Sequence, residues 1–268
     1  MSYQPNHEYL HEGNVIEVNH KSYHIKGRMI QPMGRYSEVY RATSISSGKD
    51  YAIKIMIPEG SMLGPYFNHN VDERKHAFSI EIDLLRQLKG NPAVVKIHDH
   101  GIENGSGLPI IIEELYDISK RISTYKTVFS EQAAYCFSVQ LFTLLASIHS
   151  KKIAYRDFQQ PHFFFYWDEK AFDGVLKVVD WNLSSQGVIE DLSLEHEMES
   201  MRRNGLHNLF LSNSEIFKIV FREKHDTAKD VIVKLLKYGV KENFRCPSNA
   251  PIRYRIYHWW LKFQDWRR

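Results

Sequence analysis

Residues 148–165 read IHSKKIAYRDFQQPHFFF, and residues 176–182 read LKVVDWN. The first stretch has the pattern of a helix end, a turn that carries Arg156 and Asp157, and a short aromatic strand. The second has the pattern of a strand that ends in Asp180. In phosphoryl transfer one carboxylate orients or deprotonates the attacking hydroxyl, and another holds the metal that bridges the nucleotide phosphates. Asp157 and Asp180 are therefore a candidate pair for this chemistry.

Size and composition limit the classes of protein that this chain can belong to. With 268 residues, 43% of them hydrophobic, it can bury a sizeable core as one large domain or two lobes. The formal net charge of +3 is mild and argues against nucleic acid as a partner. No apolar run has the length of a membrane span, and the N-terminus lacks the layout of a signal peptide, so we expect no membrane partner.

The cysteines indicate the compartment. Two cysteines, Cys136 and Cys246, are too few for a disulfide framework, and Cys136 falls in an apolar helical pattern typical of a small core residue. We therefore expect a reducing, cytoplasmic location.

The first part of the chain has the pattern of an antiparallel sheet with one helix. Asp72 can cap this helix, whose apolar residues recur at helical spacing and which ends at Gly90-Asn91-Pro92. Five strands are predicted, at residues 22–26, 38–42, 51–56, 94–97 and 108–113. This lobe ends near residue 115, and the boundary is expected to form a cleft.

The second part has a helical pattern. Ser130 is expected to cap a long apolar helix over residues 131–149. Further helical patterns cover residues 193–212, 214–222, 226–238 and 251–266. The basic and aromatic tail, residues 253–268, either docks RNA or a partner or closes the core of this lobe, and its helical spacing favours the core.

The stretch around Asp157 resembles the catalytic loop of the eukaryotic-type protein kinases, which reads His-Arg-Asp and has an Asn five residues later. Here the residues are Tyr-Arg-Asp, with His162 at the Asn position, and Asp180-Trp181-Asn182 resembles the family's Asp-Phe-Gly. The resemblance implies an α+β, bilobal, protein-kinase-like fold, with a five-stranded antiparallel sheet and one helix in the N-lobe (1–115) and a reduced, mostly helical C-lobe (116–268) of a single domain. It also implies ATP and Mg²⁺ or Mn²⁺ as cofactors. The acceptor would be a hydroxyl, either a Ser or Thr of a protein or that of a small molecule.

The resemblance extends to the expected nucleotide site. Tyr-Ala-Ile-Lys54 matches the family's Val-Ala-Ile-Lys strand, which implies that Lys54 meets the nucleotide phosphates and the carboxylate of Glu81. A purely structural ion pair between these two residues is the alternative, since a buried ammonium needs an anion. Residues 34–39 are similar to the phosphate loop of casein kinase II, although a plain hairpin explains them as well. The residues implied to contact the nucleotide are Gly34, Val39, Ala52, Lys54, Glu113 and Leu115.

In the implied mechanism Asp157 is the catalytic base, Lys54 and Glu81 complete the catalytic set, and Asp180 binds the metal. His162 is either a second metal ligand or a core histidine, and Asp180 could instead cap a following helix. The sequence departs from the family at several positions: Pro32, Ser37, Gln159, His162 and Asn182 replace the expected residues. The Ala-Pro-Glu motif that ends the family's activation segment is also missing between Asn182 and Met198. These departures motivate a second hypothesis, a pseudokinase that keeps the fold as a nucleotide-binding or scaffold module. The first hypothesis, an ATP-dependent phosphotransferase, is favoured because both Asp157 and Asp180 are present.

Overall fold

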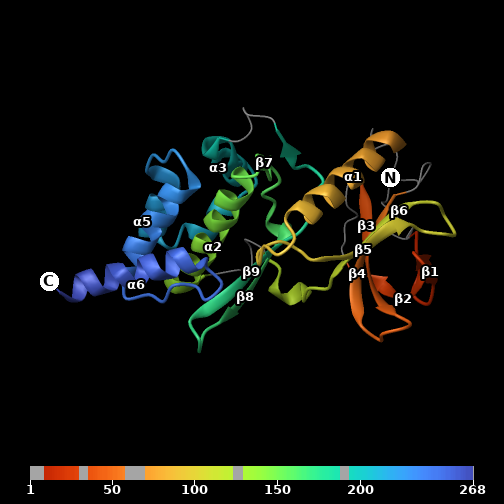
Figure 1. Cartoon of the computed structure of the whole chain (residues 1–268), viewed down its shortest axis with the longest axis horizontal. Coiled ribbons are helices and arrows are strands. Elements are labelled where there is room, and N and C mark those ends of the chain that lie inside the picture. Colours follow the sequence, from red (N-terminus) through yellow and green to blue (C-terminus); the bar gives the residue numbers. More distant parts are fainter. Residues whose placement is uncertain (1–8, 30–35, 58–69, 123–128, 188–192, 268) are drawn as a thin grey trace, which may run out of the picture. The chain divides into compact units, whose positions relative to one another are not determined.

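The first part of the chain forms an antiparallel sheet of six strands, in the order β1-β2-β3-β4-β6-β5 (Figure 1). The computed structural model describes residues 9–29, 36–57, 70–122, 129–187 and 193–267. Helix α1 (Val71–Gln87) packs on the sheet against β4, β5 and β6. The strands are β1 (Val15–Val18), β2 (Lys21–Arg28), β3 (Ser37–Ser44), β4 (Asp50–Met56), β5 (Ile97–Ile102) and β6 (Pro109–Glu114).

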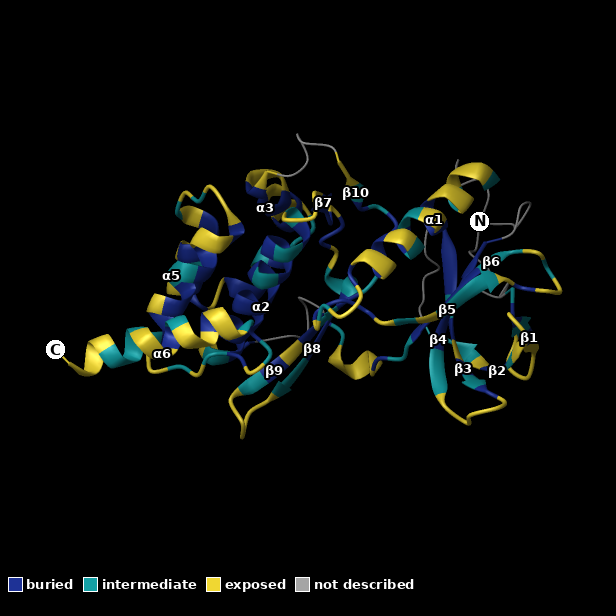
Figure 2. Cartoon of the chain, in the orientation of Figure 1, coloured by how far each residue is buried: buried dark blue, intermediate teal, exposed yellow. Residues whose placement is uncertain are grey.

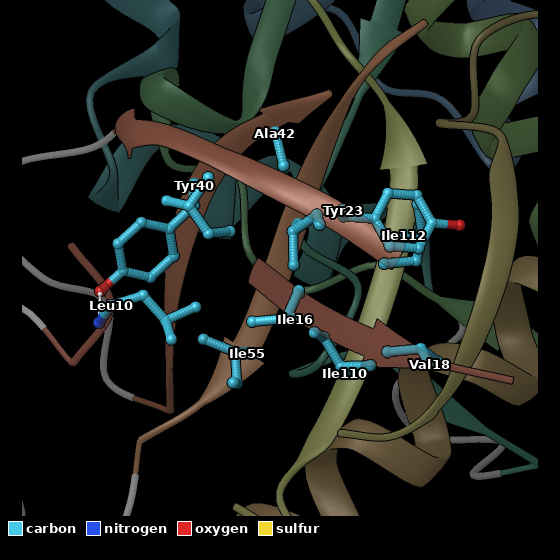
Figure 3. Packing of buried hydrophobic residues seen from close by; sticks show 11 residues of the cluster. Leu10, Ile16, Val18, Tyr23, Tyr40, Ala42, Ile55, Ile110 and Ile112 are labelled. Carbon is cyan, nitrogen blue, oxygen red and sulfur yellow. Dashed lines mark hydrogen bonds between the residues drawn. The ribbon is translucent and has the colours of Figure 1, made fainter. Parts of the chain in front are cut away.

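The two faces of this sheet have different partners because side chains alternate along a strand. One face carries a cluster of buried apolar side chains that includes Tyr40, Ile53 and Ile112. The segment at Leu10 covers part of it, and its backbone N–H donates to the Tyr40 hydroxyl at 3.0 Å (Figure 3). On the opposite face Ile111 and Met56 pack against Phe78 of α1. Lys54, two residues before Met56, therefore lies on the face that α1 covers.

The sheet has six strands where the sequence predicted five, because residues 15–18 form an additional strand. A two-residue turn, Asn19-His20, joins β1 to β2, and its two residues have φ of 50° and 62°. Positive φ at both central positions is the type I′ geometry that matches the twist of hairpin strands. This turn commonly has glycine at its second position. His20 occupies that position here, so the sequence lacks the usual signal for a hairpin.

Two predicted boundaries in this unit are wrong. Asn70, rather than Asp72, caps α1: the Asn70 side chain accepts from the Glu73 N–H at 2.8 Å, and the Glu73 carboxylate accepts from the Asn70 N–H at 3.2 Å. This reciprocal pair satisfies two donors that a helix end would otherwise leave without partners. The strand predicted at 94–97 begins at Ile97, because Val94 instead forms an isolated bridge with Val178.

The second part of the chain is built around α2 (Glu131–His149), whose N-terminus Ser130 caps as predicted. Most of α2 is buried (Figure 2), and burial raises the pKa of the Cys136 thiol to about 12. The other helices are α3 (Leu194–Arg203), α4 (Ser214–Phe217), α5 (Ala228–Lys241) and α6 (Ile252–Trp266), with a π-helical turn at Lys218–Arg222 and 3₁₀ turns at Ile118–Lys120, Gln160–His162 and Leu206–Phe210. The strands are β7 (Ile153–Ala154), β8 (Phe163–Asp168), β9 (Asp173–Val178) and β10 (Ser185–Gln186).

These elements confirm the predicted α+β class and the predicted helices, with one break. The helix predicted over 193–212 ends at Arg203, and Gly205 adopts a left-handed φ of 73° before the following 3₁₀ turn. The hairpin of β8 and β9 joins the aromatic strand after Asp157 to the strand before Asp180. Short loops around this hairpin thus bring the two candidate carboxylates into one neighbourhood.

The chain divides into two compact units, Met1–Lys89 with Val95–Ile118 and Gly90–Val94 with Ser119–Arg268. Among the described residues, no helix combines the length and the apolar character that crossing a membrane requires.

Candidate active site

The predicted site residues of the first unit form a buried ion pair on the α1 face of the sheet. Lys54 Nζ lies 2.9 Å and 2.7 Å from the two carboxylate oxygens of Glu81. The side chains of Lys54 and Glu81 are 5% and 0% exposed. Burial of two charges is costly unless the geometry is good, and one ammonium bonded to both oxygens meets that condition. The predicted pairing of Lys54 with Glu81 is confirmed.

Strand register places other predicted nucleotide contacts around Lys54. Val39 pairs with Lys54 across β3 and β4, and Ala52 pairs with Glu113 across β4 and β6. Directly paired residues in antiparallel strands face the same side, and so do residues two apart. Val39, Ala52, Lys54 and Glu113 therefore share one face, and Leu115 follows directly after β6. Gly34 and Pro32 lie outside the described residues.

In the second unit the structure brings three predicted site residues together. His162 Nδ1 lies 3.4 Å from Asp157 Oδ2, and His162 Nε2 lies 3.5 Å from Asp180 Oδ2. His162 Nδ1 is also 3.2 Å from the backbone carbonyl of Asp157. The side chain of Asp157 is 8% exposed and that of Asp180 is 29% exposed. One imidazole thus stands between the two carboxylates.

Tyr155 ties the Asp157 loop to the Asp180 loop. It occupies the position where the kinase loop has His, is 1% exposed, and its ring lies 4.8 Å from that of Trp181. Its hydroxyl donates to the backbone carbonyl of Val179 at 2.8 Å, and its own carbonyl accepts from Ser184 Oγ at 3.0 Å.

Asp180 has a left-handed φ of 61°, and no helix begins in residues 181–187. The alternative reading of Asp180 as a helix cap for that segment is therefore not supported.

Glu197 of α3 is a site residue that the sequence did not reveal. It is 1% exposed, and its two oxygens accept from the backbone N–H groups of Tyr155 at 2.9 Å and Arg156 at 3.2 Å. Ser200, one turn later, donates to the Arg156 carbonyl at 2.6 Å. Arg156 has a φ of 66°, a conformation that L-residues rarely adopt, so α3 stabilises an unfavourable turn before Asp157.

A signal for Glu197 was nevertheless present in the sequence. It stands on the apolar side of its helix, among Leu194, Met198 and Met201, all of which are buried. A carboxylate on an apolar stripe needs a partner inside the protein, as buried Glu81 of α1 does in its pair with Lys54.

Oxygen and nitrogen atoms suited to a metal meet at Asp180 and His162. Within the described parts of the chain no group of three or more His, Cys, Asp or Glu side chains could hold a metal ion. A cation there would thus take one or two ligands from the protein. Mg²⁺ beside nucleotides is commonly bound in this way, with phosphate and water supplying the other ligands. The residues therefore fit a nucleotide-bound divalent ion.

Comparison with known proteins yields one family. The family model described as the protein kinase domain matches residues 32–201. Calcium-dependent protein kinase 5 of Plasmodium falciparum is 30% identical over 57% of this chain and 24% of its own length. Calcium-dependent protein kinase 22 of Arabidopsis thaliana is 25% identical over 56% of this chain and 29% of its own length. The matches thus span only 24% and 29% of the length of these two relatives.

Proposed function

The chain belongs to the protein kinase domain family, and from this premise we propose that it is an ATP-dependent phosphotransferase that uses the residues described above. Family membership supports kinase-type phosphoryl transfer. The observation that carries the finer proposal is the position of His162, 3.4 Å from Asp157 and 3.5 Å from Asp180, because it links the proposed base to the proposed metal ligand.

In this proposal Asp157 accepts the proton of a substrate hydroxyl, whose oxygen forms a bond to the γ-phosphorus of ATP. The bond between that phosphorus and the β,γ-bridging oxygen breaks, and ADP leaves. Lys54, oriented by both oxygens of Glu81, binds the nucleotide phosphates as a fixed positive charge. Val39, Ala52, Glu113 and Leu115 contact the remainder of the nucleotide, and Gly34 its phosphates.

Asp180 and His162 would hold the divalent ion, which when bound neutralises charge on the phosphates. The His162 Nδ1 atom lies 3.2 Å from the Asp157 carbonyl; when Nδ1 carries the proton, Nε2 presents its lone pair toward Asp180. A nitrogen ligand suits Mn²⁺ better than Mg²⁺, which prefers oxygen. We therefore infer that either ion supports the reaction and that Mn²⁺ binds better.

The acceptor is a hydroxyl of a protein Ser or Thr or of a small molecule. The missing Ala-Pro-Glu motif and the exposed Gln159, where the family has lysine, favour a small acceptor over an extended peptide.

We also propose that the two units are the lobes of one kinase domain, divided near residue 115, and that the chain works in the cytoplasm. The two free thiols, Cys136 and Cys246, support that location.

A pseudokinase is the second candidate, and a specific contact favours it. The imidazole of His162 lies within 3.5 Å of an oxygen of each carboxylate, so it is placed to engage the proposed base and the proposed metal ligand together. A folded module with this contact and an intact Lys54–Glu81 pair would bind nucleotide without turnover.

The test is transfer of label from γ-labelled ATP to a Ser/Thr peptide library and to small polyols, with Mg²⁺ or Mn²⁺. We expect transfer by the unmodified protein, at least about a hundredfold less by Asp157→Asn and Asp180→Asn, and unchanged transfer by Asp83→Asn, a control at an exposed position. Equal transfer by all four proteins would refute the assigned roles. If no transfer occurs but ATP raises the melting temperature, the pseudokinase is correct.

A further inference from the structure

The outer face of α6 carries an apolar stripe that the protein leaves exposed. Buried Tyr254 and His258 face the interior, and α6 contacts α5. The sequence predicted that the aromatic residues of this tail close the core, and for the tryptophans that prediction is wrong. On the opposite side Ile252 is 67%, Ile256 59%, Trp259 65% and Trp266 82% exposed.

The spacing shows that these residues form one line. At 100° per residue, positions i, i+4, i+7, i+11 and i+14 fall on the same side of a helix. In α6 this line consists of Ile252, Ile256, Trp259, partly exposed Phe263 and Trp266. The Phe263 ring lies 5.8 Å from that of Trp259 and 6.4 Å from that of Trp266, with planes inclined by 12° and 29°. The three aromatic rings are thus stacked one after another along the helix.

Cations flank the stripe on both sides. By the same helical spacing, exposed Arg255 and half-buried Lys262, whose Nζ donates to Asn243 Oδ1 at 3.1 Å, lie along one edge. Arg253 and Arg267 lie along the other. Among the described residues no ion pair joins these four side chains to an acidic group. The only acidic residue in α6, Asp265, lies on the side toward Tyr254 and His258. The exposed face of α6 is therefore apolar along its centre and positively charged at its margins.

The sequence predicted no membrane partner, but the exposed face of α6 leads us to propose that it docks on the surface of an anionic phospholipid membrane. An interfacial helix buries a stripe of Trp, Phe and aliphatic side chains at the boundary of the headgroups and acyl chains, while flanking Lys and Arg bind acidic headgroups. With a rise of about 1.5 Å per residue, the 15-residue helix is about 22 Å long, which is the length over which it would contact a membrane when lying in its plane. A partner helix suits this face less well, because stacked rings do not provide the separate side chains that insert into the holes of a facing helix. A nucleic acid also suits it less well, because the aliphatic Ile252 and Ile256 do not stack on bases.

The experiment is co-sedimentation of the full chain with vesicles of phosphatidylcholine alone or of phosphatidylcholine with about a third phosphatidylserine. The comparison measures how much the acidic headgroups contribute to binding. We expect binding to the anionic vesicles, little binding to the neutral ones, and weaker binding as salt rises, because exposed charges are screened. The variant Trp259→Ser/Trp266→Ser should lower the partition coefficient at least about tenfold, and Arg255→Glu/Lys262→Glu should do the same. Leu211→Ser, at an exposed apolar residue in a turn outside α6, is the matched control and should bind unchanged.

Quenching of tryptophan emission by brominated acyl chains gives a second readout. It should occur with the unmodified protein and be lost in Trp259→Ser/Trp266→Ser, in which three tryptophans are left. Failure of the protein to bind anionic vesicles, or equal binding by the double tryptophan variant, would overturn the proposal. Two other results would also overturn it. One is a concentration-dependent dimer that the double tryptophan variant abolishes. The other is binding of a labelled oligonucleotide, but not of vesicles, that the same variant abolishes. None of these readouts depends on phosphoryl transfer.

Discussion

The Nε2 atom of His162 lies 3.5 Å from the Oδ2 atom of Asp180. Two ligands at about 2.1 Å from one cation are separated by roughly 3.0 to 3.5 Å, so this spacing suits a shared divalent ion. In the protein kinase family an asparagine oxygen occupies the position of His162. The exchange of oxygen for nitrogen makes metal preference the property most directly set by this residue.

His162→Asn is expected to shift the preference from Mn²⁺ toward Mg²⁺ by at least about tenfold, because it replaces a nitrogen donor with an oxygen donor. The measurement is a titration of each metal in the presence of ADP, followed by the melting temperature and, for Mn²⁺, by its paramagnetic resonance signal. His76→Asn, at an exposed residue of α1, is the control. An unchanged ratio of the two affinities would show that His162 does not bind the metal.

Lys54→Met should lower the free energy of unfolding by about 3 to 5 kcal/mol, because it leaves the fully buried Glu81 carboxylate without its ammonium. Lys54→Met/Glu81→Leu should recover most of that loss, since apolar side chains can replace a buried pair. The double variant separates the two roles of the pair. If Lys54 binds phosphate, ATP should no longer raise the melting temperature of the double variant. If ATP raises the melting temperature of the double variant as much as that of the unmodified protein, the pair is purely structural.

Glu197→Gln is expected to lower the free energy of unfolding by about 1 to 3 kcal/mol, because one of the backbone N–H groups of Tyr155 and Arg156 loses its acceptor. The turn before Asp157 should loosen, so kcat falls more than KM rises. Urea denaturation and amide hydrogen exchange at Tyr155 and Arg156 measure the effect. Glu199→Gln, at an exposed position on the same helix, should change neither quantity. Unaltered exchange at both amides in Glu197→Gln would contradict this role.

Gly239→Ala tests the close approach of α5 to α2. Helix propensity alone predicts that alanine stabilises α5 by about 1 kcal/mol. A Cβ atom at Gly239, however, would lie 2.5 Å from Cζ of the buried Tyr135. We expect a net loss of about 1 to 2 kcal/mol in the free energy of unfolding, because overpacking outweighs propensity. Lys237→Ala, on the exposed side of α5, is the control, and a stabilised Gly239→Ala protein would be inconsistent with this packing.

His258 should make stability depend on pH. Burial, with a smaller contribution from Lys262, lowers the pKa of His258 from 6.5 to about 4. Below pH 6.5 the unfolded chain takes up a proton that the folded chain does not, so the free energy of unfolding falls by about 2 kcal/mol between pH 7 and pH 5. In His258→Phe this part of the pH dependence should disappear, as measured by urea titrations at each pH. Parallel profiles for the two proteins would rule His258 out as the cause.

The sequence by itself determined the elements whose signals are local. Ser130 caps α2, the strand that carries Lys54 forms where it was predicted, and the hairpin of β8 and β9 joins the loops of Asp157 and Asp180. Each of these features depends on residues close together in the chain. Periodicity and turn chemistry act over that range, so they could be recognised without the fold.

Only the tertiary structure decided which distant groups complete these elements. Glu197 bonds to a backbone N–H group 42 residues earlier in the chain, and no local pattern predicts that contact. In α6 apolar residues occupy two opposite faces, so periodicity cannot tell which face is buried. Contact with α5 selected the face of Tyr254 and His258, and this choice left Trp259 and Trp266 exposed. Burial depends on the neighbouring surface as well as on the helix, which is the physical reason that the sequence alone could not settle it.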